Sequence, residues 1–438
     1  MRSTAAIPRR LPRDFWLYFA GQVTSTLGSS FTRFALPLLV FQLTGSATSL
    51  GAAMAVTYLP PIMFGLIVGA LADRFDRKRM MIGTDVGRGV LVALVPTLAI
   101  AGTLHVGWIY AVLFAHSTLR ILFNAGQYAG VASLVDKEQL VTANGRIQAS
   151  SSTAAILGPV LAGLLITTVP VADTLFVDAG TYAVSAASLA LIRRSFNEIP
   201  AKDHPGAGER GRALIRSLVR DTGEGLRYVW RHPVLRNISI MLAILNAFTG
   251  TIDAQLVFWA KHQLHAPNSE IGYLYAAGGF GAVVVSLLAG PLRRRWRFSI
   301  IVLATLAVEG LATIGLGLTS TYALALVLWA CYSGVGVLFT INTLSLRQQI
   351  VPNRLLGRVM SVSRMLAAST LPIGSLAGSF VISATGDIGV VYIVIGVITL
   401  VVTLVFSRSP LGRAERYLPG GDLAAATDAL TQHHGPSQ

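Results

Sequence analysis

Residues 69–79 read Gly69-Ala70-Leu71-Ala72-Asp73-Arg74-Phe75-Asp76-Arg77-Lys78-Arg79 and join two long apolar stretches. The stretches, 49–72 and 79–102, each exceed the roughly 20 residues that an α-helix needs to cross about 30 Å of hydrocarbon. The link is dominated by charge, because four of the six residues 74–79 are basic. The pattern predicts a membrane hairpin whose link lies on the cytoplasmic side, where Lys and Arg collect.

Ten further stretches of the same kind occupy the rest of the chain. Of the 438 residues, 53% are hydrophobic and 13% are charged, and mean hydropathy is +0.62. Soluble proteins carry about 25% charged residues, so we expect lipid to be the natural solvent. Only helices bury such runs in lipid, which offers the backbone no hydrogen-bond partner. We therefore predict an all-α integral membrane protein with twelve transmembrane helices at 15–42, 49–72, 79–102, 107–133, 142–168, 173–193, 235–261, 270–291, 298–318, 321–346, 355–384 and 388–407.

The positive charge predicts the orientation of these helices. If the N-terminus is inside, 30 of the 35 Lys and Arg residues fall in inner segments, and the outer loops hold only Lys261. This asymmetry predicts a multi-pass protein of the inner (plasma) membrane with both termini in the cytoplasm. It also accounts for the net charge of +15 without a nucleic-acid partner.

The two halves of the chain resemble each other at a nearly constant offset. At an offset of 216, Phe123 corresponds to Phe339, Gly158 to Gly374 and Ala162 to Gly378. Such internal similarity predicts a duplication, with two pseudo-symmetric six-helix halves. The expected organisation is an N-terminal tail at 1–13, a first half at 14–193, a cytoplasmic central loop at 194–234, a second half at 235–407 and a flexible cytoplasmic tail at 408–438.

The central loop contains an amphipathic segment at 213–230. Its apolar residues Leu214, Leu218, Leu226 and Val229 fall near one helical face, and its arginines lie elsewhere on the helix. One interpretation is an interfacial helix on an anionic inner leaflet. The other is a surface helix packed on the inner ends of the bundle.

The link at 69–79 resembles the signature loop of the major facilitator superfamily, G-x-x-x-D-R-x-G-R-R/K. The matching residues are Gly69, Asp73, Arg74, Arg77 and Lys78, whereas Asp76 stands where the family has its second glycine. A glycine lets helices approach closely, and a carboxylate can meet a helix N-terminus or an arginine. The departure at Asp76 puts the usual tight turn in doubt. By resemblance, the loop gates the cytoplasmic side and does not touch substrate.

The predicted fifth helix resembles the G-x-x-x-G-P-x-x-G-G motif of proton-driven exporters. Gly158, Pro159 and Gly163 match, whereas Ala154 and Ala162 replace two glycines. A proline loosens a helix, and small residues make a close-packing face. The alternative is ordinary small-residue packing.

Two further stretches, 176–186 and 225–236, are similar to the enterobactin-exporter and macrolide-efflux-like branch of the superfamily. The resemblance covers roughly residues 14–407. It implies the major facilitator fold, with the first, fourth, seventh and tenth helices around a central cavity.

Polar and charged residues on those four helices are the candidate cavity residues. They are Arg33; His116, Arg120, Asn124 and Gln127; Asn246, Asp253 and Gln255; and Tyr332 and Asn342. The spacings of 4, 4 and 3 along the fourth helix place its four residues on one face.

Asp253 is the one carboxylate on these four predicted helices. Our hypothesis is that Asp253 takes up and releases a coupling proton as it moves away from Arg33. The alternative is a static ion pair between Arg33 and Asp253 that joins the halves.

Four other charged residues lie on helices that the resemblance makes supporting ones: Asp85, Arg88, Asp178 and Glu309. We expect these to pair within the bundle, although Glu309 has no obvious partner in sequence.

The sequence lacks an ATP-binding loop, a metal-binding cluster and the common catalytic motifs. We therefore expect no enzymatic activity, no catalytic or metal site and no cofactor. The favoured function is a monomeric secondary transporter, driven by protons, that exports a small hydrophobic or amphipathic compound such as a drug, antibiotic or siderophore. The alternatives are a nutrient importer of the same fold and a non-transporting membrane receptor or enzyme.

Overall fold

The computed structural model describes residues 11–72, 76–136, 139–194, 196, 220 and 222–417, and all regular elements in these ranges are helices. The labelled elements are α1 (Arg13–Thr44), α2 (Ala47–Ala72), α3 (Arg77–Ile100), α4 (Val106–Leu134), α5 (Leu140–Leu165), α6 (Thr174–Leu191), α8 (Pro233–Ala254), α9 (Leu256–His262), α10 (Asn268–Arg295), α11 (Phe298–Leu318), α12 (Tyr322–Ile350), α13 (Asn353–Thr385), α14 (Ile388–Ser407) and the 3₁₀-helix η2 (Pro410–Tyr417). All except α9 and η2 are 18 residues or longer, which confirms the twelve predicted helices within the described residues.

The observed limits lie within four residues of the predicted ones for every helix but the seventh. The prediction of one helix at 235–261 is wrong, because the chain leaves helical geometry at Gln255 (φ −99°, ψ 6°) between α8 and α9. The amide of Gln255 donates to the Ala47 carbonyl at 2.9 Å, so a contact distant in sequence accompanies the break.

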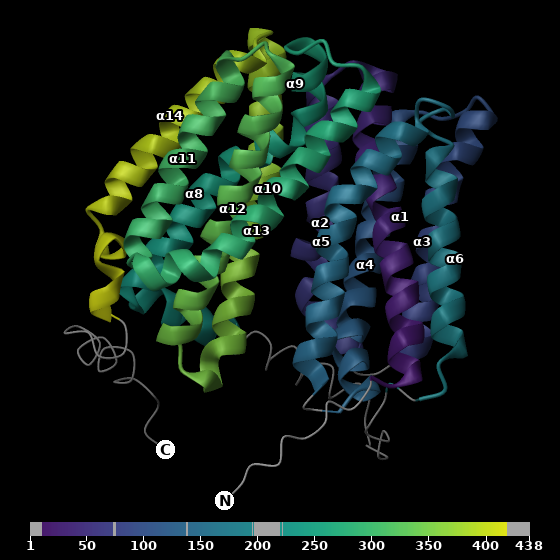
Figure 1. Ribbon diagram of the computed structural model, residues 1–438, viewed down its shortest axis with the longest axis horizontal. Helices are drawn as coiled ribbons and strands as arrows, with labels where there is room; N and C mark the ends of the chain where they lie inside the picture. The colour runs from purple at the N-terminus through teal and green to yellow at the C-terminus, as the bar shows by residue number, and fades with distance from the viewer. Residues whose placement is uncertain are drawn as a thin grey trace, which may run out of the picture. The chain divides into compact units, whose positions relative to one another are not determined.

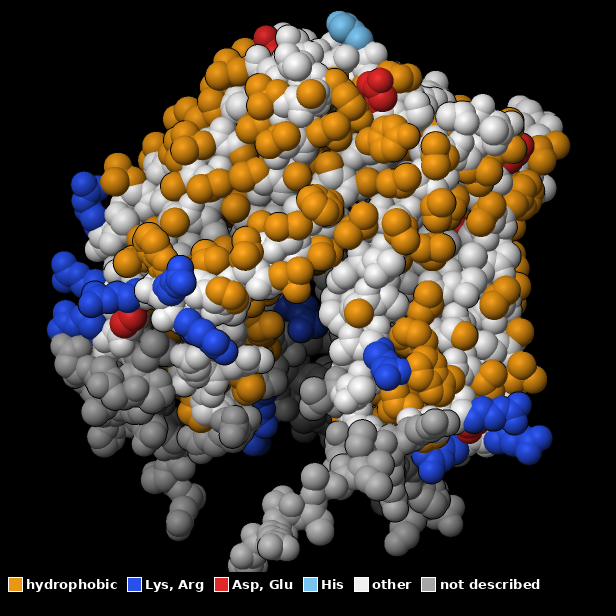
Figure 2. Space-filling model, in the orientation of Figure 1, with side chains coloured by type: hydrophobic (Ala, Val, Ile, Leu, Met, Phe, Trp, Pro, Cys, Tyr) orange, Lys and Arg blue, Asp and Glu red, His pale blue; other side chains and the backbone are white. Residues whose placement is uncertain are grey.

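The helices expose many large apolar side chains on the outside of the protein, in addition to those buried in its core. In the described residues, eleven helices are long and apolar enough to cross a membrane. The twelfth, α1, has lower hydropathy because it carries Arg33 and many Ser and Thr residues. Leu287 and Phe380 are 73% and 69% exposed. Figure 2 shows apolar side chains along the flanks of each unit, with Lys and Arg gathered toward one end. This distribution fits helices embedded in lipid.

The chain forms two compact units, Met1–Leu36 with Met63–Pro205, and Pro37–Ile62 with Gly206–Gln438. In the first unit α3 packs on α4 and α6, and in the second α11 packs on α12 and α14 (Figure 1). The second unit also includes the hairpin 37–62, which lies within the first half as divided by sequence. Its carbonyls at Ala47 and Gly51 accept bonds from Gln255 and Ser375.

The glycines matched by the repeat make equivalent helix contacts in the two units. A Cβ at Gly158 of α5 would lie 2.2 Å from Ser30 Cβ of α1, and one at Gly374 of α13 would lie 1.7 Å from the Ala247 oxygen of α8. Each glycine therefore lets the fifth helix of its half touch the first. These equivalent helix contacts support the duplication independently of the matching residues in the sequence.

Residues 220 and 222–230 are the described part of the amphipathic segment predicted at 213–230, and residues 213–219 and 221 lie outside the described residues. Tyr228 and Val229 are buried in a cluster with Val351, Leu355 and Val359. On the same helix, Leu226 and Trp230 are exposed. The described segment thus packs on the bundle with one face and leaves a second apolar face for the predicted membrane interface.

We predict that Gly374→Ala destabilises the protein by about 1–3 kcal/mol, because the added methyl meets backbone that cannot give way. Gly290→Ala is the matched control, since a Cβ there has nothing within 4 Å. Thermal unfolding of the purified variants measures the difference. Equal midpoints for both variants would contradict the close contact between α8 and α13.

Candidate functional site

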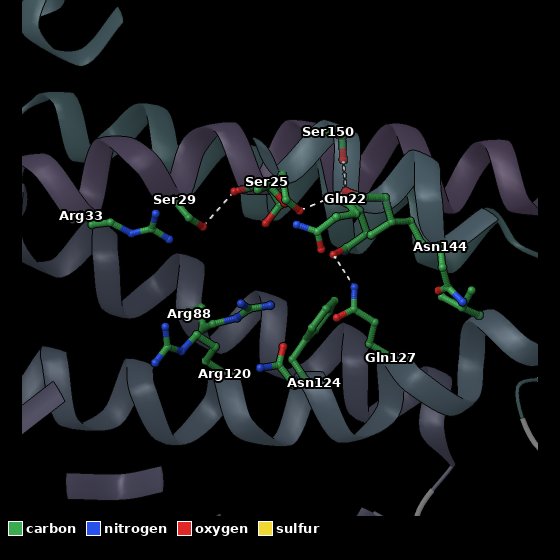
Figure 3. A pocket seen from close by; sticks show the side chains of 16 residues that line it. Gln22, Ser25, Ser29, Arg33, Arg88, Arg120, Asn124, Gln127, Asn144 and Ser150 are labelled. Atoms are coloured by element: carbon green, nitrogen blue, oxygen red, sulfur yellow. Dashed lines mark hydrogen bonds between the residues drawn. The ribbon is translucent and has the colours of Figure 1, made fainter. Parts of the chain in front are cut away.

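The first unit contains a polar cavity of about 380 Å³ between α1, α3, α4 and α5. Figure 3 shows its labelled side chains converging from these helices. Thirteen of the sixteen lining residues are polar or charged: Gln22, Ser25, Thr26, Ser29, Arg33, Arg88, Arg120, Asn124, Gln127, Asn144, Gln148, Ser150 and Ser151. The polar residues of α1 therefore face this cavity, which explains how so polar a helix fits an apolar bundle.

Arg88 is the most tightly held of the cavity's three arginines. It forms an ion pair with Asp85 one helical turn away. Its guanidinium lies 4.4 Å from the ring centre of Phe123 and 4.6 Å from that of Tyr182. Ser185 Oγ donates to Asp85 Oδ2 at 2.7 Å. Rings and carboxylate together fix the guanidinium at the cavity wall.

The predicted stripe on the fourth helix divides into two environments. Arg120, Asn124 and Gln127 line the cavity. His116 is half-buried instead, and its Nε2 lies 2.8 Å from the Tyr182 hydroxyl. That hydroxyl is also 3.0 Å from Ser29 Oγ, so His116 belongs to a bonded network behind the cavity wall.

A second network runs along the inner part of the same cavity. Gln127 Nε2 donates to the Tyr18 hydroxyl at 2.6 Å and to Gln22 Oε1 at 3.4 Å. Gln22 Nε2 in turn donates to Ser185 Oγ at 3.2 Å. Through Ser185 the chain of bonds reaches Asp85, which links residues of α1, α3, α4 and α6.

Asp178 of α6 is fully buried behind α1. Its carboxylate accepts one bond from Thr32 and one, at 3.1 Å, from Thr181. Hydroxyl donors thus satisfy this carboxylate within the bundle, as we expected for a supporting helix.

The second unit contains a cavity of about 370 Å³ between α8, α11 and α12. Asp253, Asn246, Glu309 and Tyr332 contribute its polar groups together with Thr249, Ser333 and Thr340. Lys, Arg and His are absent from the described residues that line it. Neither Asp253 nor Glu309 has a hydrogen-bond or ion-pair partner for its carboxylate among the described residues.

Glu309 and Arg88 are charged cavity residues that the sequence reasoning did not place at a cavity. Glu309 was assigned to a supporting helix and was the exception that had no obvious partner in sequence, and the structure places it at the cavity that Asp253 also lines. A signal was available, because the offset of 221 that relates Gly69 to Gly290 also relates Arg88 to Glu309. Both members of this pair line the cavity of their unit.

Three other predicted residues of the second half have different surroundings. Asn246 lines the cavity and donates to the Ala367 carbonyl at 2.7 Å. Gln255 and Asn342 are fully buried outside the lining set. Asn342 donates to the Leu338 carbonyl at 2.9 Å and accepts from Arg293 at 3.4 Å. Arg33 and Asp253 each line the cavity of a different unit.

The signature loop contacts the end of α6. Lys78 Nζ donates to the carbonyls of Ala190 and Ile192 at 3.1 and 2.6 Å, where the negative end of a helix dipole favours a cation. Arg77 donates to the Phe196 carbonyl at 3.4 Å. Asp76 caps α3 by accepting from the Arg79 amide at 2.8 Å, so an aspartate has a role of its own at the family's glycine position.

The remaining motif residues are only partly described. Asp73 and Arg74 lie outside the described residues, and Gly69 is helical in α2. Gly158, Pro159 and Gly163 are buried in α5, and Ser30 Oγ of α1 donates to the Ala154 carbonyl at 3.1 Å. The motif thus provides a contact surface for α1. In the described ranges, no group of three or more His, Cys, Asp or Glu side chains could hold a metal ion.

We predict that Asp85→Ala destabilises the protein by about 3–5 kcal/mol, because it leaves Arg88 as an uncompensated buried charge. The double variant Asp85→Ala/Arg88→Leu should recover much of that loss. Thermal unfolding of Asp85→Ala, Arg88→Leu and the double variant tests the pair. A double variant as unstable as the sum of its single changes would contradict an ion pair at this position.

Known proteins resemble this chain over most of its length. The family model described as Major Facilitator Superfamily matches residues 18–368 and 246–427. Macrolide efflux protein A of Streptococcus pyogenes is 24% identical over 363 residues, covering 82% of this chain and 87% of the relative. Multidrug efflux pump Tap of Mycolicibacterium fortuitum is 26% identical over 378 residues, covering 83% and 88%.

Solved structures share the fold at lower identity. The nucleoside transporter NupG has a TM-score of 0.68 at 12% identity, covering 90% of this chain and 98% of its own. A bacterial homologue of the iron transporter ferroportin, in an inward-facing state, has a TM-score of 0.65 at 17% identity, covering 91% and 100%. The arrangement of helices and the family match agree, and the chain belongs to the Major Facilitator Superfamily of membrane transporters.

Proposed function

We propose that this transporter exports a small amphipathic compound in exchange for protons, with Asp253 and Glu309 as the proton-binding pair. The observation that carries the proposal is the pair of carboxylates at the cavity of the second unit, which have no basic counter-charge among the described lining residues. Ionisable groups inside membrane helices are costly and mark proton and substrate pathways.

The chemistry of the pair suits reversible protonation. A carboxylate that faces a cavity without a basic counter-charge can carry a proton, whereas contact with water or a cationic group favours its release. The conformational change of an alternating-access transporter provides such a change of surroundings. The hypothesis that Asp253 binds a proton when it moves away from Arg33 stays a prediction, since the two residues belong to different units.

Export is supported by the printed names of the relatives, an efflux protein for macrolides and a multidrug efflux pump. The proposed site of action is the cell's inner membrane, with both termini in the cytoplasm, on the strength of the Lys and Arg distribution. The buried Gly158 and Pro159 fit the exporter-type motif, although their contact with α1 has a counterpart at Gly374.

A second candidate function is import of a polar nutrient. The observation that favours it is the polar lining of the cavity in the first unit, which offers many hydrogen-bonding groups. The direction of flux separates the two functions.

The test uses inside-out vesicles that are energised by respiration, with a pH-sensitive dye to follow lumenal protons. We expect a macrolide or another amphipathic compound to release protons from wild-type vesicles. Asp253→Asn should abolish this release because the amide cannot carry a proton, and Glu309→Gln should reduce it. The matched control is Glu270→Gln, which removes a carboxylate of α10 that does not line the cavity.

Two outcomes would overturn the proposal. Normal compound-driven proton release from Asp253→Asn vesicles would remove Asp253 from coupling. Accumulation of a polar nutrient by intact cells, with no response to the amphipathic panel, would make the protein an importer. Immunoblots of membrane fractions check that each variant is inserted at wild-type levels.

A further inference from the structure

The cavity of the first unit has a cationic wall. Arg33 comes from α1, Arg88 from α3 and Arg120 from α4, and Figure 3 shows all three at the same pocket. Its sixteen described lining residues include no Asp or Glu. The charge is therefore of one sign where a ligand would sit.

Two fully buried carboxylates of the first unit, Asp85 of α3 and Asp178 of α6, do not line the cavity. Asp85 is bound to Arg88 and Ser185. Asp178 accepts hydrogen bonds from two threonine hydroxyls behind α1. Arg33 and Arg120 line the cavity with exposed side chains, so guanidinium groups besides that of Arg88 are presented to a ligand there.

The repeat shows that this charge is particular to the first half. The offset of 216 relates Phe123 to Phe339 and Arg120 to Gly336, and all four residues line the cavity of their own unit. The offset of 221 relates Arg88 to Glu309. Equivalent positions thus carry arginines in the first unit and glycine or an acid in the second, so the shared scaffold does not itself require the arginines.

We propose that the first-unit cavity binds an oxyanion group, a carboxylate or sulfonate, of an amphipathic substrate. This inference rests on the proposed export function and names its substrate class. A guanidinium offers two parallel donors to such a group. Asp85 and two aromatic rings hold Arg88 in place. Arg33 and Arg120 supply charge at the same cavity wall, and Ser29 and Asn124 add neutral polar groups there. A volume of about 380 Å³ accommodates a small aromatic acid.

Binding to the purified transporter in phosphatidylcholine nanodiscs tests the inference without any proton gradient. The probes are 1-naphthylacetate and 1-pyrenebutyrate, each compared with its neutral amide by isothermal titration calorimetry. We expect at least one acid to bind more tightly than its amide. Arg33→Gln and Arg120→Gln should each weaken binding of the acid by roughly tenfold or more, with little change for the amide.

Arg146→Gln is the matched control. It removes one arginine from α5 of the same unit, but Arg146 lies over Trp16 at 4.7 Å and does not line the cavity. This variant should keep the wild-type preference for the acid. Equal affinity for acid and amide in the wild type overturns the inference, as does an undiminished preference in Arg33→Gln and Arg120→Gln.

Nanodiscs of phosphatidylglycerol distinguish a soluble anion from a lipid headgroup. An affinity for the acid that falls less than about threefold supports a soluble substrate. A tenfold or greater fall, with the amide unaffected, assigns the site to an anionic lipid and overturns the inference. Asp253→Asn should keep the preference for the acid. Absence of compound-driven proton release from wild-type vesicles, with the preference for the acid retained, sinks only the proposed antiport. Retained coupling without the preference sinks only the oxyanion site.

Discussion

The ion pair of Arg88 with Asp85 illustrates the constraint on which every charged position in this chain depends. A charge surrounded by apolar helices must meet an opposite charge, a set of hydrogen-bond donors or water. Arg88 meets Asp85 and two aromatic rings, and Asp178 meets two threonine hydroxyls. Asp253 and Glu309, whose carboxylates have no hydrogen-bond or ion-pair partner among the described residues, line one cavity, and Arg33 lines the other. The distribution of charge therefore separates positions that hold the bundle together from positions that face a ligand or a proton.

The same constraint limits how far sequence alone could lead. Helix positions follow from the length of apolar runs, because lipid leaves the backbone no other structure, and α11 and α14 have the predicted limits. The break at Gln255 could not be predicted, since it accompanies a bond to Ala47 that joins residues 208 apart. A polar residue in an apolar run indicates that the side chain needs a hydrogen-bonding or charged partner, but the sequence does not identify which residue that partner is. Asn342 and Gln255 found theirs in the bundle, whereas Asn246 both bonds to it and lines the cavity.

Glu309 shows why family-based assignment of helices is incomplete. The resemblance placed the cavity on four helices, yet α3 and α11 each contribute one charged lining residue, Arg88 and Glu309. A side chain long enough to pass between two inner helices reaches a cavity from the layer behind. Internal repetition was the better guide, because it relates these two residues directly. Their neighbours Gly89 and Gly310 approach α6 and α14 respectively, which shows that the correspondence extends to packing.

In α3 and α11, one face of the helix packs on a neighbouring helix and another carries the charged side chain toward the cavity. This arrangement explains how one scaffold carries opposite charges in its two halves. In α3 and α11 the glycine beside the charged residue lets the helix pack closely against the last helix of its half, while the charged side chain reaches the cavity. Reversing the charge of that side chain leaves the glycine contact intact. The energetic cost of the change therefore depends on the cavity and on the groups that pair with the side chain. In the first unit the partner is Asp85, and the offset of 221 puts Leu306 at its place in the second. Glu309 thus lacks the fixed counter-charge that holds Arg88, and this difference is the reason that we propose a proton as its exchangeable partner.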